Sequence, residues 1–220
     1  MSKLETRYER CAVCKHAHLE EVVVSFDALR SPARRQAIFD RSFQRFTCAF
    51  CGAPNAVEDA FMYTDFDRGQ WIGCFPSSWE VVWQRHEHEP QRAFQATVAG
   101  PNAPPPARRL AANLRVRATF GLEALREKLV IFEAGLDDAL VEALKLDLMR
   151  ALPNLTLHPE HRPRLDSVAG ERLEFVVPGE RLDVPADECR RIAADPSYAR
   201  LLAELRAHPY VDIGRILIGG

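Results

Sequence analysis

Apolar and polar residues alternate along much of the N-terminal half, with one helical pattern between the strand-like stretches. Residues 19–29 (LEEVVVSFDAL) are rich in β-branched side chains and predict a strand. Residues 31–43 begin with Ser31 and Pro32, a capping residue and a proline in the first turn, and predict a helix. Residues 45–52 predict a short strand that leads into a cysteine-containing turn.

A hairpin and a proline-rich stretch follow. Residues 61–66 and 70–75 predict two strands joined by a tight turn that ends in glycine. Residues 99–107 (AGPNAPPPA) contain three consecutive prolines, which favour polyproline II and end a helix. The sequence therefore predicts a first module over residues 1–98, a linker over 99–107 and a second region over 108–220.

The second region has a mixed pattern. Residues 121–134 place leucines at helical spacing before Gly135, and Asp137 caps a second helix that extends to about residue 152. Before the helical pair, a strand is expected over 113–120. After it, four short strands are expected over 155–160, 163–169, 172–177 and 181–185. Two helices over 186–194 and 197–208 and a closing strand over 210–218 complete the prediction. The predicted fold class is α+β.

Composition and charge limit the kinds of partner that the sequence favours. The chain of 220 residues is 47% hydrophobic and carries a formal net charge of −2, so charge favours neither a polyanion nor an anionic membrane as partner. The N-terminal residues lack the apolar stretch of a secretory signal, and no run of about 18 apolar residues predicts a membrane span. We therefore expect a cytoplasmic protein that does not associate with membranes.

Four of the six cysteines lie in two short hooks, CAVC (Cys11 and Cys14) and CAFC (Cys48 and Cys51). Two Cys-x-x-Cys hooks supply the four thiolates that a tetrahedral structural zinc site requires. The 33 residues between the hooks exceed the usual spacing, and the predicted strand–helix–strand insertion explains the excess. The sequence predicts one structural zinc ion per chain. A redox pair and ordinary buried thiols are the alternatives.

Other residues near the hooks, and the remaining thiols, are assigned more ordinary roles. His16 and His18 follow the first hook and could each replace a cysteine as ligand, although four thiolates already complete the coordination shell. Cys74 and Cys189 fall within a predicted strand and helix, where buried and inert thiols are expected.

The hooks and the segments around them resemble the CpXC family of bacterial proteins. The similar segments are CAVC, VVVSFDALRSPARRQAIFD, FTCAFCG, AFMYTDF, WIGCFP and LREKLVIFEAGLDDALVEALKLDLM, which together span roughly residues 8–150. The resemblance implies a zinc-ribbon-like N-terminal module with an inserted helix, followed by an α+β region. Both hooks carry alanine (Ala12 and Ala49) where the family name implies proline. Because proline is not a ligand, this difference leaves the zinc prediction in place.

No catalytic constellation is apparent in the sequence. It lacks the nucleophile-elbow, nucleotide-binding and zinc-protease motifs. Asp137 and Asp138 are explained by helix capping. Tyr63 and Asp65 share one face of a predicted strand and are the candidate site of an unrecognised enzyme.

Two non-enzymatic classes remain. Arg34, Arg35, Arg41 and Arg45 form a basic cluster that would suit nucleic acid, but the chain is slightly acidic and lacks interleaved aromatic residues. The favoured hypothesis is a non-enzymatic zinc-binding adaptor or regulatory protein. Its partner would be another cytosolic protein, such as a small GTPase or its regulator, and the aromatic residues Trp79 and Trp83 motivate this choice.

Overall fold

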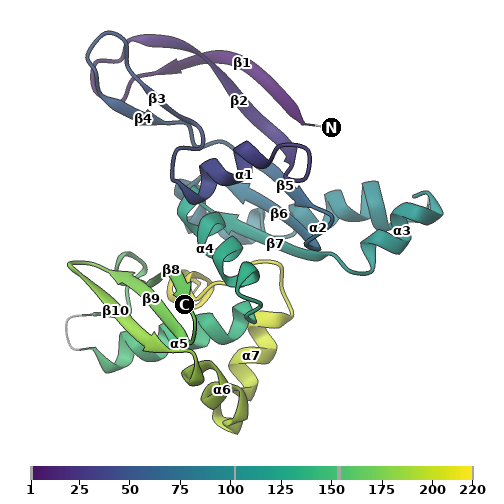
Figure 1. The fold of residues 1–220 in the computed structure, drawn as a ribbon, viewed down its shortest axis with the longest axis vertical. Helices are drawn as coiled ribbons and strands as arrows, with labels where there is room; N and C mark the ends of the chain where they lie inside the picture. Colours follow the sequence, from purple (N-terminus) through teal and green to yellow (C-terminus); the bar gives the residue numbers. More distant parts are fainter. Residues whose placement is uncertain (1, 102, 153–154, 220) are drawn as a thin grey trace. The chain divides into compact units, whose positions relative to one another are not determined.

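Buried side chains collect in two compact units of the chain. The structure, a computed structural model, describes residues 2–101, 103–152 and 155–219. Unit 1 comprises Met1–Trp79 and Gln84–Leu122, and unit 2 comprises Glu80–Trp83 and Glu123–Gly220. Both contain helices and strands (Figure 1), so the chain is an α+β protein as predicted.

Unit 1 is built on a five-stranded sheet of order β1-β2-β5-β6-β7. The pairs β1/β2 and β5/β6 are antiparallel, whereas β2/β5 and β6/β7 are parallel. The predicted hairpin is confirmed as β5 and β6, with Tyr63 opposite Ile72. The strands are β1 (Lys3–Arg10), β2 (Ala17–Asp27), β5 (Phe61–Asp65), β6 (Gln70–Phe75) and β7 (Arg115–Phe120).

Helices cover both faces of this sheet. Helix α1 (Pro32–Phe39) and the segment after it pack on one face, where the ring of Phe43 lies 5.3 Å from that of Phe61. On the opposite face lie α2 (Glu89–Phe94), the π-helical turn η2 (Gln95–Ala99) and α3 (Pro105–Ala111), which bury Trp71. Gly73 permits this packing, because a Cβ there would lie 2.4 Å from the Cγ of Pro90.

The division between the units differs from the predicted linker. It falls between Leu122 and Glu123, because β7 pairs with β6 and therefore belongs to unit 1. The last two prolines of the predicted linker 99–107 begin helix α3, because proline is well tolerated in the first turn of a helix. The expected modules 1–98 and 108–220 do not match the two units.

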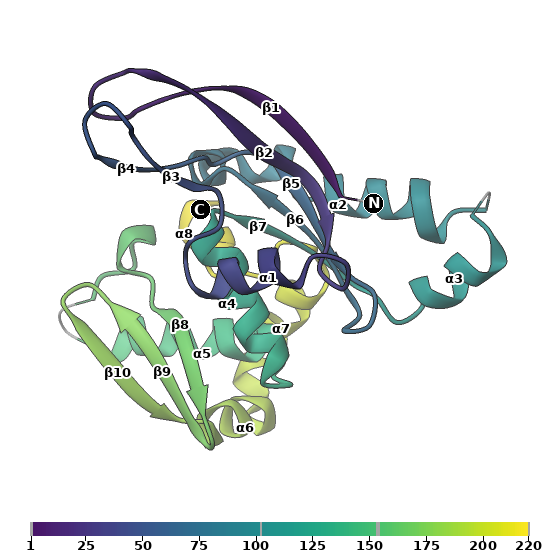
Figure 2. The same cartoon turned by 45° about the horizontal axis from the view of Figure 1, so that its top comes forward.

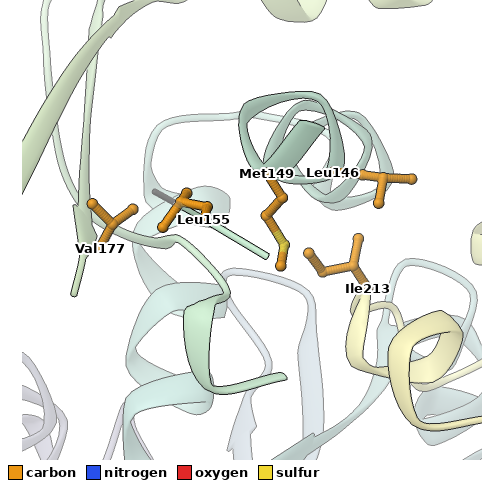
Figure 3. Packing of buried hydrophobic residues seen from close by; sticks show 5 residues of the cluster. All are labelled: Leu146, Met149, Leu155, Val177 and Ile213. Carbon is orange, nitrogen blue, oxygen red and sulfur yellow. The ribbon is translucent and has the colours of Figure 1, made fainter. Parts of the chain in front are cut away.

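Unit 2 combines a helical pair with a three-stranded sheet of order β10-β9-β8. Its core includes Leu146 and Met149 of α5, Val177 of β9, Leu155 and Ile213 (Figure 3). Asp137 caps α5 by accepting a hydrogen bond from the Ala139 amide, as predicted. The elements are α4 (Leu122–Glu133), α5 (Asp138–Ala151), η3 (Pro159–His161), β8 (Arg164–Ala169), β9 (Arg172–Val177), β10 (Glu180–Pro185), α6 (Asp187–Ala194), η4 (Pro196–Tyr198), α7 (Ala199–Arg206) and α8 (Gly214–Ile218).

Two expected strands of unit 2 are wrong. Residues 155–160 are not a strand and end in the short 3₁₀ turn η3. The expected closing strand over 210–218 contains helix α8 instead, because Asp212 accepts a hydrogen bond from the Gly214 amide and so begins a helical turn.

Buried charges link several elements of unit 2. Lys145 of α5 is fully buried and its Nζ donates to Glu127 of α4 at 3.1 Å and to Glu142 at 2.9 Å. Arg162 pairs with Asp212 at 2.6 Å. Each of these carboxylates has a cationic partner, which is the condition under which buried charges are tolerated.

Within residues 2–101, 103–152 and 155–219, no helix is both long enough and apolar enough to cross a bilayer.

Candidate metal centre

Both cysteine hooks form the same backbone turn. The first connects β1 to β2, and the second connects β3 (Arg45–Thr47) to β4 (Pro54–Ala56). In the first hook the Cys11 amide donates to the His16 carbonyl at 2.9 Å, and the Lys15 amide donates to the Cys11 carbonyl at 3.0 Å. In the second hook Cys48, Ala53 and Gly52 repeat these bonds at 2.9 and 2.8 Å. The two hooks are therefore equivalent knuckles at the ends of two hairpins (Figure 1).

The knuckles bring together the sulfur atoms of all four cysteines that the sequence predicts as metal ligands. Cys11 Sγ lies 3.6 Å from Cys51 Sγ, and Cys14 Sγ lies 3.5 Å from Cys48 Sγ. All four sulfurs lie within 4.8 Å of one another. Both of these close contacts join a sulfur of one knuckle to a sulfur of the other. The space between the knuckles is therefore surrounded by two thiols from each hairpin.

This arrangement has the dimensions of a tetrahedral thiolate site. Metal–sulfur bonds of about 2.3 Å place the sulfurs of a tetrahedron about 3.8 Å apart. The shortest sulfur–sulfur distances of 3.5 and 3.6 Å are close to that value. The four cysteines can therefore hold a metal ion as a closed set of ligands.

The backbone of each knuckle also favours a thiolate. The amides of Cys14 and Val13 point at the Cys11 sulfur and lower its pKa to about 6 against the opposing effect of burial. Burial raises the pKa of Cys48, but the amides of Cys51 and Phe50 outweigh it and the pKa is lowered. Thiolates are the form that metals bind, so the first cysteine of each knuckle is prepared for coordination.

Asn55 connects the two knuckles and was not identified from the sequence. It lies in β4 and is buried; its Nδ2 donates to Cys11 Sγ at 3.5 Å, and its Oδ1 accepts from the Ala12 amide at 2.7 Å. A proline at position 12 would have no N–H for this bond. Alanine in place of the family's proline is thus accompanied by a hydrogen bond that holds the first knuckle. Only the position of a polar residue just after the second hook hinted at such a role.

Of the two histidines considered as ligands, His18 has its ring beside a sulfur atom. His18 Nε2 is 3.1 Å from Cys48 Sγ. His18 therefore contacts one of the four candidate ligands and is not a member of the four-sulfur group. The His16 ring stacks on Phe50 with centroids 5.2 Å apart. Cys74 and Cys189 are buried and do not belong to the group of four sulfurs, and burial raises their thiol pKa values to about 12 and about 11.

Lys15 occupies a position that favours glycine. Its φ of 61° matches the 71° of Gly52 at the equivalent position of the second knuckle, and both lie in the left-handed region. A side chain there costs about 1 kcal/mol. We expect Lys15→Gly to raise the free energy of unfolding by roughly 0.5–1 kcal/mol in urea titrations, with unchanged metal content. The matched change Gly52→Lys should lower it; a loss of stability in Lys15→Gly would contradict this account.

Tyr63 and Asp65, the candidates for an enzyme site, are both buried in unit 1. Arg35 Nε donates to the Tyr63 hydroxyl at 3.2 Å, and Arg68 donates to Asp65 at 3.0 Å. Burial raises the pKa of Tyr63 to about 12. These contacts explain both side chains as parts of a bonded cluster between α1 and the sheet.

Paired hairpins that present four cysteines to one point define a four-cysteine metal-binding site. Comparison with known families matches residues 10–145 to the family described as CpXC protein. Because the match covers more than half of the chain, this protein belongs to the CpXC family. Comparisons with curated proteins and with solved structures gave no match.

Proposed function

We propose that Cys11, Cys14, Cys48 and Cys51 hold one structural zinc ion and that the chain is a non-enzymatic protein that binds another protein. The observation that carries the first part is the closed set of four sulfurs from two equivalent knuckles. Four thiolate ligands in tetrahedral array are typical of structural zinc, whereas catalytic zinc keeps one position open. The metal would stabilise a pair of hairpins that bury few apolar residues.

The second part rests on exposed apolar side chains at the tips of the knuckles. Val13 and Phe50 each occupy the third position of their hook and are 69% and 74% exposed. Exposed aromatic side chains such as that of Phe50 are enriched at protein–protein interfaces. Trp83, which also motivated the hypothesis of a protein partner, is buried and therefore contributes less to it than these tip residues.

The basic residues offer less support for a nucleic-acid partner. Arg34 pairs with Glu21 at 3.1 Å, and Arg35 is mostly buried beside Tyr63. Both arginines are thus engaged within the chain, which leaves less charge for phosphate groups.

Substitution of the tip residues tests the proposed surface. We expect Val13→Ser/Phe50→Ser to lose the protein that the wild-type chain captures by crosslinking in native lysate, because its apolar contact area is removed. Metal content should stay unchanged, since neither residue is a ligand. Leu157→Ser, which alters a residue 55% exposed in unit 2, is the control and should retain capture. Equal capture by all three proteins, or recovery of nucleic acid alone, would contradict the proposal.

A further inference from the structure

Among the residues that the structure describes, strand β1 is an edge of the unit 1 sheet and pairs with β2 on one side only. In both views of the ribbon it forms the outer margin of that sheet (Figures 1 and 2). The side chains of Lys3, Glu5, Thr6, Tyr8 and Arg10 are exposed. An eight-residue edge strand is long enough to accept another strand through its backbone.

The hydrogen-bond pattern identifies which residues of β1 face outward. The Cys11 amide donates to His16 on the opposing arm of the hairpin. Because these bonds alternate along an antiparallel pair, Glu5, Arg7 and Glu9 direct their backbone groups toward β2. The backbone groups of the even-numbered residues from Leu4 to Arg10 therefore point to the free edge.

The sequence of this strand, KLETRYE over residues 3–9, is complementary to itself in reverse. We propose that β1 pairs with β1 of a second copy of this chain, antiparallel and centred on Thr6, to join two sheets into one. Lys3 then lies opposite Glu9 of the second copy, Glu5 opposite Arg7, and Leu4 opposite Tyr8. The two-fold symmetry repeats each pair, as in other isologous interfaces.

Hydrogen bonding and charge both select this register. A shift of one residue would place outward-facing backbone groups opposite residues whose own groups face β2, and the ladder would not form. A shift of two, centred on Glu5 or Arg7, would place like charges opposite each other. Like charges directly opposite are destabilising, whereas opposite charges stabilise a strand pair.

The contacts already present in the chain agree with this arrangement. Lys3 pairs with Glu5 at 3.0 Å and Arg7 with Glu9 at 2.5 Å, so charges of alternating sign run along β1. The second copy would place an opposite charge across from each of them. Tyr8 is 74% exposed beside Leu19, its partner on β2, and would gain Leu4 of the second copy as an apolar neighbour.

Sedimentation across a range of concentrations, with charge-reversal variants, tests the proposal. We expect the wild-type chain of 24.9 kDa to form dimers. Glu5→Lys and Arg7→Glu should each weaken self-association at least about tenfold, because every dimer contains the altered pair twice. An equimolar mixture of the two variants should form a heterodimer, since Lys at position 5 of one chain then meets Glu at position 7 of the other, and Arg7 meets Glu5.

Two further variants separate pairing from folding and from net charge. Thr6→Pro removes an N–H that points outward, so we expect it to abolish the dimer while metal content and circular dichroism stay unchanged. Glu171→Lys changes net charge as Glu5→Lys does, but on an 86% exposed side chain of unit 2, and should leave the dimer intact.

A wild-type chain that stays monomeric up to about 200 µM would overturn the proposal, because strand pairing of this length would then be too weak to matter. So would a dimer that survives both charge reversals and Thr6→Pro. A mixture of Glu5→Lys and Arg7→Glu that remains monomeric would overturn the register.

Discussion

Cys48→Ser is expected to unfold the paired hairpins of unit 1 and to abolish metal binding. Cys48 is buried and its sulfur lies 3.5 Å from that of Cys14, so its loss opens the ligand set. Structural zinc contributes on the order of 10 kcal/mol to the folding of small metal-binding modules, which is comparable to the whole stability of a domain. Hydrogen exchange should show loss of protection in β1–β4, and metal content should fall from one equivalent to none.

Cys74→Ser is the matched control. Cys74 is as buried as Cys48, but its sulfur contacts the Gly121 carbonyl at 3.6 Å, a bond that a serine hydroxyl can also donate. We expect the free energy of unfolding to fall by about 1–2 kcal/mol and the metal content to stay at one equivalent. If both variants lose metal and melt alike, the assignment of the ligands is wrong.

Lys145→Met is expected to give the largest loss of stability in unit 2. Lys145 is fully buried and neutralises Glu127 and Glu142, which are themselves buried. Removing one partner of a buried ion pair leaves uncompensated charge and costs roughly 3–5 kcal/mol. Urea unfolding of the whole chain should show this as a lower midpoint for the transition of unit 2.

Two further variants check the origin of that loss. Adding Glu142→Gln should restore part of the stability, because without Lys145 the Glu142 carboxylate keeps only Lys128 at 3.9 Å, whereas Glu127 keeps Arg164 at 2.7 Å. Arg172→Met breaks a pair with Asp183 in which both side chains are about half exposed, and should have a far smaller effect because solvent screens that pair. Equal losses in Lys145→Met and Arg172→Met would contradict the role of burial.

Elements with strong local signals were predictable from the sequence. Ser31 and Pro32 placed the start of α1 correctly, and Gly135 and Asp137 placed the junction of α4 and α5. Strand β1 was not predicted, because an exposed edge strand carries alternating charges in place of alternating apolar residues. The end of the chain was predicted as a strand because its apolar residues outweighed the local bond from the Gly214 amide to Asp212, and the pair of Asp212 with Arg162 forms only in the fold.

In the candidate metal site, too, only the features with a local sequence signal were predictable. Cysteine spacing alone indicated the four sulfurs that the structure brings together. Asn55 was missed, because its contacts to Cys11 and Ala12 span more than 40 residues of sequence and depend on the meeting of two hairpins. The strained conformation of Lys15 was foreshadowed only by the glycine at the equivalent position of the second hook.

Native mass spectrometry with elemental analysis, on protein purified without chelator, measures whether the four cysteines hold zinc. We expect one zinc ion per chain, lost when any of Cys11, Cys14, Cys48 or Cys51 is replaced by serine. A metal-free chain whose four thiols titrate as free or disulfide-bonded groups would contradict it.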